Sequence, residues 1–243
     1  MTRVLFAVSG SAYWTLTDGT RHPCGFWPEE LAVPHQRFTA AGFETVIATP
    51  GAAVPVADEA GFSEAMNGGS PEPGCRFRAY LHSIAGELEH PQVLEEQSAG
   101  DYDLIFVPGG HGPMEDLASS AEFGELVAQF AAADKTVAAV CHGPAALLPA
   151  AAADGSWLFA GRRVTGFSNA EEAAVGFAES APWLLEDRLA ASGGRYERSG
   201  QPWTPHVVAD GPLYTGQNPA SSAPLADRLI AGAGMPADST AAV

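Results

Sequence analysis

Four short apolar runs constrain the fold of this chain more than any other feature, and they occupy residues 3–8, 44–49, 103–108 and 136–140. Continuous apolar runs of this length are typical of strands that are buried on both faces. Apolar residues at helical spacing separate the last two runs, at 122–133. Because strands alternate with helices, the pattern predicts an α/β sandwich with a mainly parallel sheet and helices on both faces.

The rest of the chain extends this pattern. We expect helices at 28–42, 77–88, 182–191 and 219–231, a strand at 163–167, and a hairpin of 206–209 with 213–215. Residues 9–25 are predicted to form a long polar loop, and 50–73 are rich in turn residues and weakly patterned. We therefore assign one domain to residues 1–243, with an insertion at 50–73 and a frayed tail at 232–243.

The charge balance argues against two classes of partner. The chain has 12 Lys and Arg against 29 Asp and Glu, a formal net charge of −17 at pH 7, which opposes nucleic acids and anionic membrane surfaces. No apolar run approaches the roughly 18 residues of a membrane span, and the first residues lack a signal-peptide pattern.

Cys24, Cys75 and Cys141 are an odd number at wide spacing, which favours free thiols in a reducing compartment. We expect a cytoplasmic enzyme.

The run at 136–140 leads into Cys141, His142, Gly143 and Pro144, and then into helix-forming alanines and leucines. We therefore expect Cys141 on a sharp strand-to-helix turn at the carboxyl edge of the sheet, where such folds bind ligands. Helix N-terminal amides at this turn should lower the pKa of the thiol and favour the thiolate. The alternative is a small buried hydrophobic cysteine, but the adjacent His142 favours a catalytic nucleophile.

A second loop is expected at the same edge. The run at 103–108 continues into Gly109, Gly110, His111 and Gly112, and glycines at this point let backbone N–H groups approach a ligand. His111 either contacts the substrate or merely lines the turn. Because the His and Cys residues show no close ligand spacing, we expect no metal site.

Two pairs of acids are candidates for proton transfer. Glu29 and Glu30 lie in the first turn of the first predicted helix, where Glu30 can point into a cleft and exchange a proton with a thiol or a substrate carbon. Alternatively, Glu30 only favours the helix N-terminus, by about 0.3 to 1 kcal/mol. Glu171 and Glu172 compete as the acid that orients His142, and their register favours Glu172.

Four motifs together resemble the ThiJ/PfpI superfamily: AAVCHGPAALL, VPGGHGPMEDL, GFWPEEL and VTGFSNAEEAAVG. The similarity covers roughly residues 3–230 and is greatest to the glutathione-independent glyoxalase III branch, whose relatives include heat-shock chaperone-like proteins. The resemblance implies a flavodoxin-like three-layer fold, a homodimer, and a cysteine on a nucleophile elbow.

The resemblance also implies roles for individual residues. The catalytic set would be Cys141 as nucleophile, His142 as its neighbour, Glu172 as the third member of the triad and Glu30 as the acid beside the thiol. Backbone N–H groups of Gly110 and His142 would form the oxyanion pocket.

The reaction implied by the resemblance converts a small 2-oxoaldehyde, such as methylglyoxal or glyoxal, to a 2-hydroxy acid without glutathione or any cofactor. Cys141 would add to the aldehyde, Glu30 would move a proton between adjacent carbons, and water would release the acid from a thioester. Two alternatives stay open: a cysteine hydrolase (amidase, protease or deglycase), and a holdase chaperone or redox sensor in which Cys141 is oxidised to the sulfinic acid. The fold alone does not decide among them.

Overall fold

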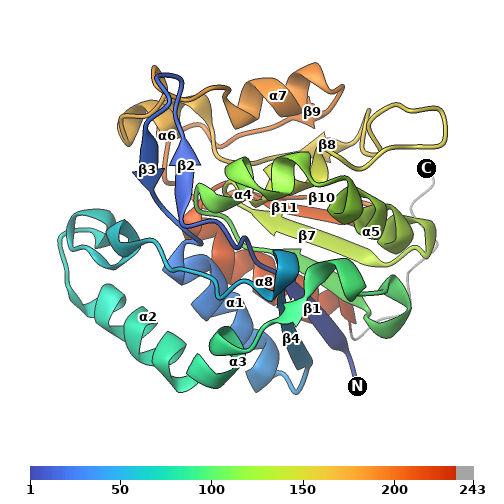
Figure 1. The fold of residues 1–243 in the computed structure, drawn as a ribbon, viewed down its shortest axis with the longest axis horizontal. Coiled ribbons are helices and arrows are strands. Elements are labelled where there is room, and N and C mark those ends of the chain that lie inside the picture. Colours follow the sequence, from blue (N-terminus) through green and yellow to red (C-terminus); the bar gives the residue numbers. More distant parts are fainter. Residues whose placement is uncertain (234–243) are drawn as a thin grey trace.

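The computed structural model describes residues 1–233 and has a central sheet with helices in front of it and behind it (Figure 1). The sheet has seven strands in the order β10-β11-β7-β6-β1-β4-β5. All neighbouring strands are parallel except β10 and β11. The strands are β1 (Arg3–Ala7), β4 (Glu44–Thr49), β5 (Gln92–Val93), β6 (Leu104–Val107), β7 (Thr136–Val140), β10 (Val207–Asp210) and β11 (Leu213–Gly216). This confirms the predicted α/β fold.

The centre of the sheet is entirely apolar. Leu5 of β1 is in register with Ile105 of β6, which is in register with Val137 of β7, and all three side chains are buried. Helices cover both faces, so these strands need no polar side and read as unbroken apolar runs. The α-helices are α1 (Pro28–Ala40), α2 (Glu72–Ser83), α3 (Ala85–Glu89), α4 (Gly112–Glu115), α5 (Ala121–Ala132), α6 (Asn169–Ala174), α7 (Leu185–Ala191) and α8 (Ser222–Ala233).

Helix α1 positions one of the predicted site residues. Pro28 occupies its first turn, and Glu29 and Glu30 follow where the helix dipole favours acids. The buried side of α1 carries Leu31 and Phe38 into the core, and Glu30 is buried with them. A charged residue is seldom fully buried without a partner, so its position indicates a specific role.

The loop predicted at 9–25 contains a hairpin of β2 (Tyr13–Thr15) and β3 (Arg21–Pro23). The strand predicted at 163–167 is also different, because only β8 (Arg163–Val164) forms and it pairs with β9 (Arg195–Tyr196) outside the main sheet. The backbone after β8 turns toward the end of β7 instead, where Phe167 N donates to Cys141 O.

The segment 50–73 contains three short 3₁₀ helices, Pro50–Ala52, Glu59–Phe62 and Ala65–Asn67, and α2 begins within it. The helix predicted at 77–88 is broken at Ile84 into α2 and α3. The predicted tail at 232–243 falls mostly outside the described residues, and α8 continues to Ala233. The assignment of one domain stays a prediction.

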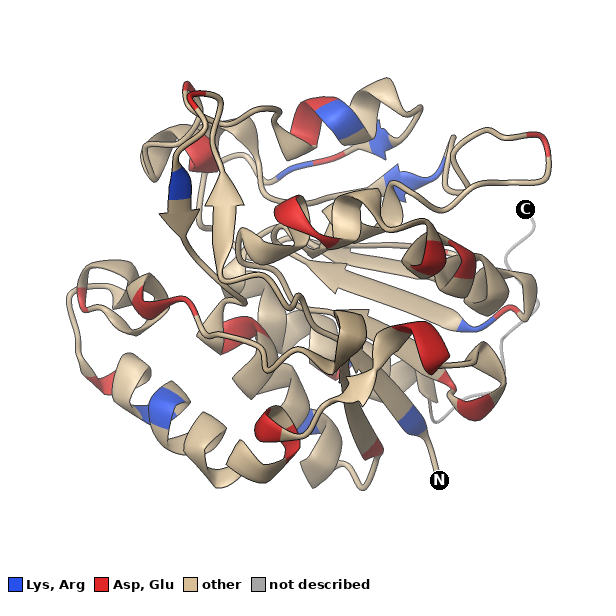
Figure 2. Ribbon diagram, in the orientation of Figure 1, with Lys and Arg blue, Asp and Glu red and all other residues tan. Residues whose placement is uncertain are grey.

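Acidic residues spread over the helices and loops around the sheet and outnumber the basic ones (Figure 2). Among the described residues, no helix combines the length and apolar character needed to cross a membrane.

Candidate active site

Cys141 follows the last residue of β7 and has a left-handed backbone, with φ of 60°. This conformation costs a residue with a side chain about 1 to 2 kcal/mol. Two backbone hydrogen bonds hold it: Cys141 N donates to Gly216 O at 2.9 Å, and Cys141 O accepts from Phe167 N at 2.8 Å. The sharp turn predicted from the sequence is therefore present, but the helix that follows is only a 3₁₀ helix, Gly143–Leu147.

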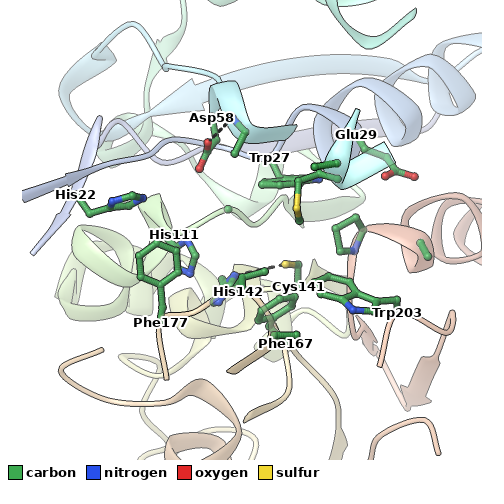
Figure 3. A pocket seen from close by; sticks show the side chains of 18 of the residues that line it. His22, Trp27, Glu29, Asp58, His111, Cys141, His142, Phe167, Phe177 and Trp203 are labelled. Atoms are coloured by element: carbon green, nitrogen blue, oxygen red, sulfur yellow. Dashed lines mark hydrogen bonds between the residues drawn. The ribbon is translucent and has the colours of Figure 1, made fainter. Parts of the chain in front are cut away.

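The turn presents Cys141 to a cavity of about 710 Å³ at the carboxyl edge of the sheet. Figure 3 shows Cys141 between His111 and Phe177 on one side and Trp203 on the other. Cys141 as a whole is only 3% exposed. Because it lines a cavity rather than the hydrophobic core alone, a small ligand in the cavity can reach it.

One carboxylate binds two histidines beside the thiol. Glu172 Oε2 lies 2.7 Å from His142 Nε2, and Glu172 Oε1 lies 2.9 Å from His111 Nε2. Burial alone would raise the pKa of Glu172, but the charge of His142 and hydrogen bonds from both imidazoles outweigh it and hold that pKa well below its usual range. An ionised carboxylate only accepts hydrogen bonds, so both Nε2 atoms carry protons.

The tautomer of His142 follows from this pairing. In the neutral ring, a proton on Nε2 leaves Nδ1 with a free lone pair. His142 Nδ1 lies 3.4 Å from Cys141 Sγ. The imidazole is therefore oriented to accept the thiol proton, as in other cysteine-histidine pairs that a third residue orients.

The neighbouring Glu171 points elsewhere. It lies at the third position of α6 and closes a capping box with Ser168. Its carboxylate also accepts from Trp203 N, Gln217 Nε2 and Asn218 Nδ2. Glu171 therefore connects the start of α6 to the loops that carry Trp203 and Asn218. Glu172 is the acid that contacts the histidines.

Glu30 lies on the other side of Cys141 and is fully buried. Its Oε2 accepts from Gly109 N at 2.7 Å, while Oε1 has no hydrogen-bond partner of normal geometry. Burial raises the pKa of Glu30 well above its usual range, and interactions with the Cys141 thiol and the Gly109 N–H lower it only in part. The side chain is thus placed to hold a proton next to the sulfur.

The thiol pKa differs from the sequence-based expectation. Burial raises the pKa of Cys141 well above its ordinary value, the charge and hydrogen bond of Glu30 raise it further, and a hydrogen bond from Gly110 N–H lowers it only in part. The expectation of a low thiol pKa was therefore wrong, because it considered the turn and not the buried acid. A proton on Glu30 removes the charge that opposes thiolate formation.

The two backbone groups predicted to form an oxyanion pocket are close to the thiol. Gly110 has φ of 84°, and its N–H interacts with the Cys141 sulfur. A Cβ at Gly109 would lie 2.7 Å from both His142 N and Glu30 Oε2. Among the described residues, neither Gly110 N nor His142 N donates to a backbone carbonyl. A ligand oxygen could therefore bind His142 N directly, and Gly110 N in place of the sulfur.

His111 has more contacts than the sequence indicated. Besides its bond to Glu172, its ring stacks on Trp14 of the β2–β3 hairpin, with centroids 4.5 Å apart and planes 10° apart. Phe177 packs against both His111 and His22. The sequence offered no local pattern that could pair residue 14 with residue 111, so this aromatic support was missed.

Three of these side chains form a potential metal-binding group. His111, His142 and Glu172 offer ligand atoms that lie within 4.8 Å of one another, although they are far apart in the sequence. Each imidazole already bonds a separate carboxylate oxygen, so an ion would have to displace both bonds. The absence of a metal site stays a prediction.

The sequence signature of the DJ-1/PfpI family matches residues 25–231. The glutamine amidotransferase-like class 1 domain-containing protein 1 of Bos taurus is 38% identical over 141 residues, which are 58% of this chain and 63% of that protein. This match therefore spans less than two thirds of the bovine relative.

Two longer matches cover most of the chain. The protein/nucleic acid deglycase HchA of Pseudomonas aeruginosa is 29% identical over 90% of this chain and 77% of its own length. The glutathione-independent glyoxalase HSP31 of Saccharomyces cerevisiae is 27% identical over 94% of this chain and 96% of its own length. The crystal structure of glyoxalase III from Candida albicans superposes with a TM-score of 0.80 at 23% identity, covering 95% of this chain and 96% of that one. It has the same flavodoxin-like fold.

Proposed function

The chain belongs to the DJ-1/PfpI family, and we propose that it is a glutathione-independent glyoxalase that converts a small 2-oxoaldehyde such as methylglyoxal to a 2-hydroxy acid. One observation carries the proposal: the Cys141 thiol lines the cavity with a buried acid, Glu30, on one side and the imidazole of His142 on the other. The similarity to a yeast protein named as such a glyoxalase supports it.

In the first step, Cys141 Sγ attacks the aldehyde carbon and the thiol proton moves to His142 Nδ1. The negative charge that develops on the aldehyde oxygen is stabilised by the N–H groups of Gly110 and His142. Each donor of this kind is worth about 3 to 4 kcal/mol in the transition state. The oxygen takes up the proton that Glu30 holds, and a hemithioacetal results with Glu30 ionised and His142 protonated.

In the second step, Glu30, now ionised, removes the proton from the carbon bonded to Sγ while His142 gives its proton to the ketone oxygen. Glu30 then returns the proton to the neighbouring carbon and takes up the proton of the hemithioacetal hydroxyl, so that the ketone is reduced as the hemithioacetal becomes a thioester. This internal transfer needs no external oxidant or reductant. Water then adds to the thioester, the carbon–sulfur bond breaks, and the 2-hydroxy acid leaves with Cys141 regenerated as the thiol. Glu172 contributes by keeping the Nδ1 lone pair of His142 directed at the thiol.

The test is lactate formation from methylglyoxal by the purified protein without glutathione. We expect turnover by the wild type and none by Cys141→Ala, with circular dichroism unchanged between the two. Failure of the wild type to consume either methylglyoxal or glyoxal, or full activity of Cys141→Ala, would overturn the proposal.

A deglycase is the second candidate, because a protein named as a deglycase is similar over 90% of the chain. It would use the same thiol to attack a glycated side chain. Comparing turnover of free methylglyoxal with that of a methylglyoxal-modified arginine, freshly prepared and freed of aldehyde, distinguishes the two. The homodimer and the cytoplasmic location expected from the sequence stay predictions.

A further inference from the structure

The cavity in front of Cys141 is much larger than a three-carbon aldehyde requires. Its volume of about 710 Å³ corresponds to roughly two dozen water molecules at about 30 Å³ each. Cavities of this size enclose ligands the size of drugs. Methylglyoxal bound to Sγ would leave most of this space to water.

The walls of the cavity are aromatic rather than polar. Trp27, Phe167, Phe177 and Trp203 line it, and Figure 3 shows them around Cys141 from several directions. Phe167 and Trp203 meet edge to face, with centroids 5.7 Å apart. Aromatic surfaces of this kind gain most when they bury another ring.

Trp203 is held in place at a cost. It is 40% exposed and its φ of 66° is left-handed, a conformation that is strained for a bulky residue. The backbone N–H of Trp203 donates to the buried Glu171 carboxylate at 2.8 Å, which fixes the loop with the indole beside the cavity. A strained and partly exposed tryptophan whose backbone is fixed by a buried carboxylate is typical of a residue that contacts a ligand.

The acids that line the cavity disfavour anionic ligands, Glu29 only in its ionised form because burial raises its pKa to about 7. Glu29 and Asp58 lie among its lining residues, and no Lys or Arg of the described chain does. A substrate with a phosphate or carboxylate group would meet these acids without a compensating cation. The cavity therefore disfavours ligands that carry an anionic group.

We infer that the cavity takes uncharged aryl carbonyl compounds and that, resting on the proposed function, the preferred substrates are aryl-substituted 2-oxoaldehydes, with phenylglyoxal as the simplest. Trp203 is the specificity-determining residue: it packs against the aryl ring while Cys141 attacks the aldehyde carbon.

The first arm of the test compares kcat/KM for phenylglyoxal and methylglyoxal. We expect the wild type to favour phenylglyoxal by about tenfold or more, since even one methylene in an apolar pocket discriminates by about this factor. Trp203→Ala and Trp203→Gly should each lower the ratio by about tenfold. Glycine accepts the left-handed backbone without strain, so Trp203→Gly removes the indole without adding backbone strain. Trp183, outside the cavity and packed on Arg188, supplies the control variant Trp183→Ala.

Comparing ratios between variants cancels the different chemical reactivities of the two aldehydes. A ratio that Trp203→Gly leaves unchanged, or a wild type that prefers methylglyoxal, overturns the inference while leaving the proposed function intact.

The second arm does not depend on turnover. Saturation-transfer NMR with acetophenone, an unreactive aryl ketone, should show binding to the wild type and to Trp183→Ala but not to Trp203→Gly, with acetone as the non-aryl control. If neither aldehyde is consumed, the glyoxalase proposal fails. Binding of acetophenone to the wild type would then still support a cavity for aryl compounds, and failure of acetophenone to bind the wild type would refute that cavity.

Discussion

Glu172→Gln tests the arrangement of two histidines around one carboxylate. The carboxylate accepts from His142 Nε2 and from His111 Nε2. A glutamine amide has one acceptor oxygen and one NH₂ donor group, so it can accept from only one of the two rings. The other imidazole must then lose its bond or adopt the opposite tautomer, and in His142 that tautomer places an N–H rather than a lone pair against Cys141.

The cost to stability follows from the bonds that change. A hydrogen bond to a charged group contributes about 1.5 to 3 kcal/mol, against about 1 kcal/mol for a neutral one. Glu172→Gln converts one charged bond to a neutral one and removes or weakens the second, so we expect a loss of about 2 kcal/mol in the free energy of unfolding at pH 7.

This loss should depend on pH. The pKa of Glu172 is lower in the folded protein than its value of 4.5 without these partners. The carboxylate therefore stabilises the folded state fully above about pH 4.5, and the stabilisation declines as pH falls toward the folded-state pKa. The difference between wild type and Glu172→Gln should shrink on acidification below about pH 4.5.

Urea denaturation of both proteins at pH 7 and near pH 3.5, with methylglyoxal kinetics at pH 7, measures both effects. Glu179→Gln is the matched control, because Glu179 is exposed on the same part of the chain. We expect Glu172→Gln to reduce kcat by about 10- to 100-fold, less than the loss of a group that transfers protons directly. Unchanged stability and turnover at pH 7 would refute the role assigned to the carboxylate.

Three further predictions concern the same site. Glu30→Gln should lower kcat by about 10² to 10⁴. Adding it to Cys141→Ala should lower activity no further, because the effects of substitutions in residues that act as one unit are not additive. Additive losses would show that the two residues act in separate roles. Burial raises the pKa of Glu29 from 4.5 to about 7, so the folded state keeps a proton that the unfolded chain releases. As pH rises from 4.5 to 8, the free energy of unfolding of the wild type should therefore fall by up to about 2 kcal/mol relative to that of Glu29→Gln. Urea denaturation of both proteins measures this, and a stability difference that stays constant from pH 4.5 to 8 would contradict the prediction. Dialysis against EDTA should leave aldehyde turnover intact, and a loss that Zn²⁺ restores would reveal a metal at His111, His142 and Glu172.

Local patterns predicted the strands and the turn that carries Cys141, because both depend on residues adjacent in the sequence. The apolar runs correspond to β1, β4, β6 and β7, with bounds that agree at five of the eight ends and differ by one residue at the other three. In contrast, the strand expected at 163–167 was mostly wrong, because its backbone bonds go to Thr215 and Cys141 rather than to a sheet neighbour.

The electrostatic state of the thiol could not be predicted from the turn alone. A helix N-terminus lowers a thiol pKa, but here that helix is a short 3₁₀ segment, and Glu30 is buried against the sulfur from α1, more than a hundred residues earlier in the chain. Only packing reveals that an acid from α1 raises the pKa of the Cys141 thiol.

The preference for Glu172 over Glu171, in contrast, has a basis in local rules. Ser168 precedes α6 as its N-cap, so Glu171 is the third helical residue, the position whose side chain returns to the N-cap in a capping box. The structure has this capping box, with Ser168 N donating to Glu171 Oε2 at 3.0 Å. The next residue of an α-helix is rotated by about 100° around the axis, and Glu172 consequently leaves the cap and points at His142 and His111. One of two adjacent acids is thus required by the helix end, and the other is free to orient the histidines.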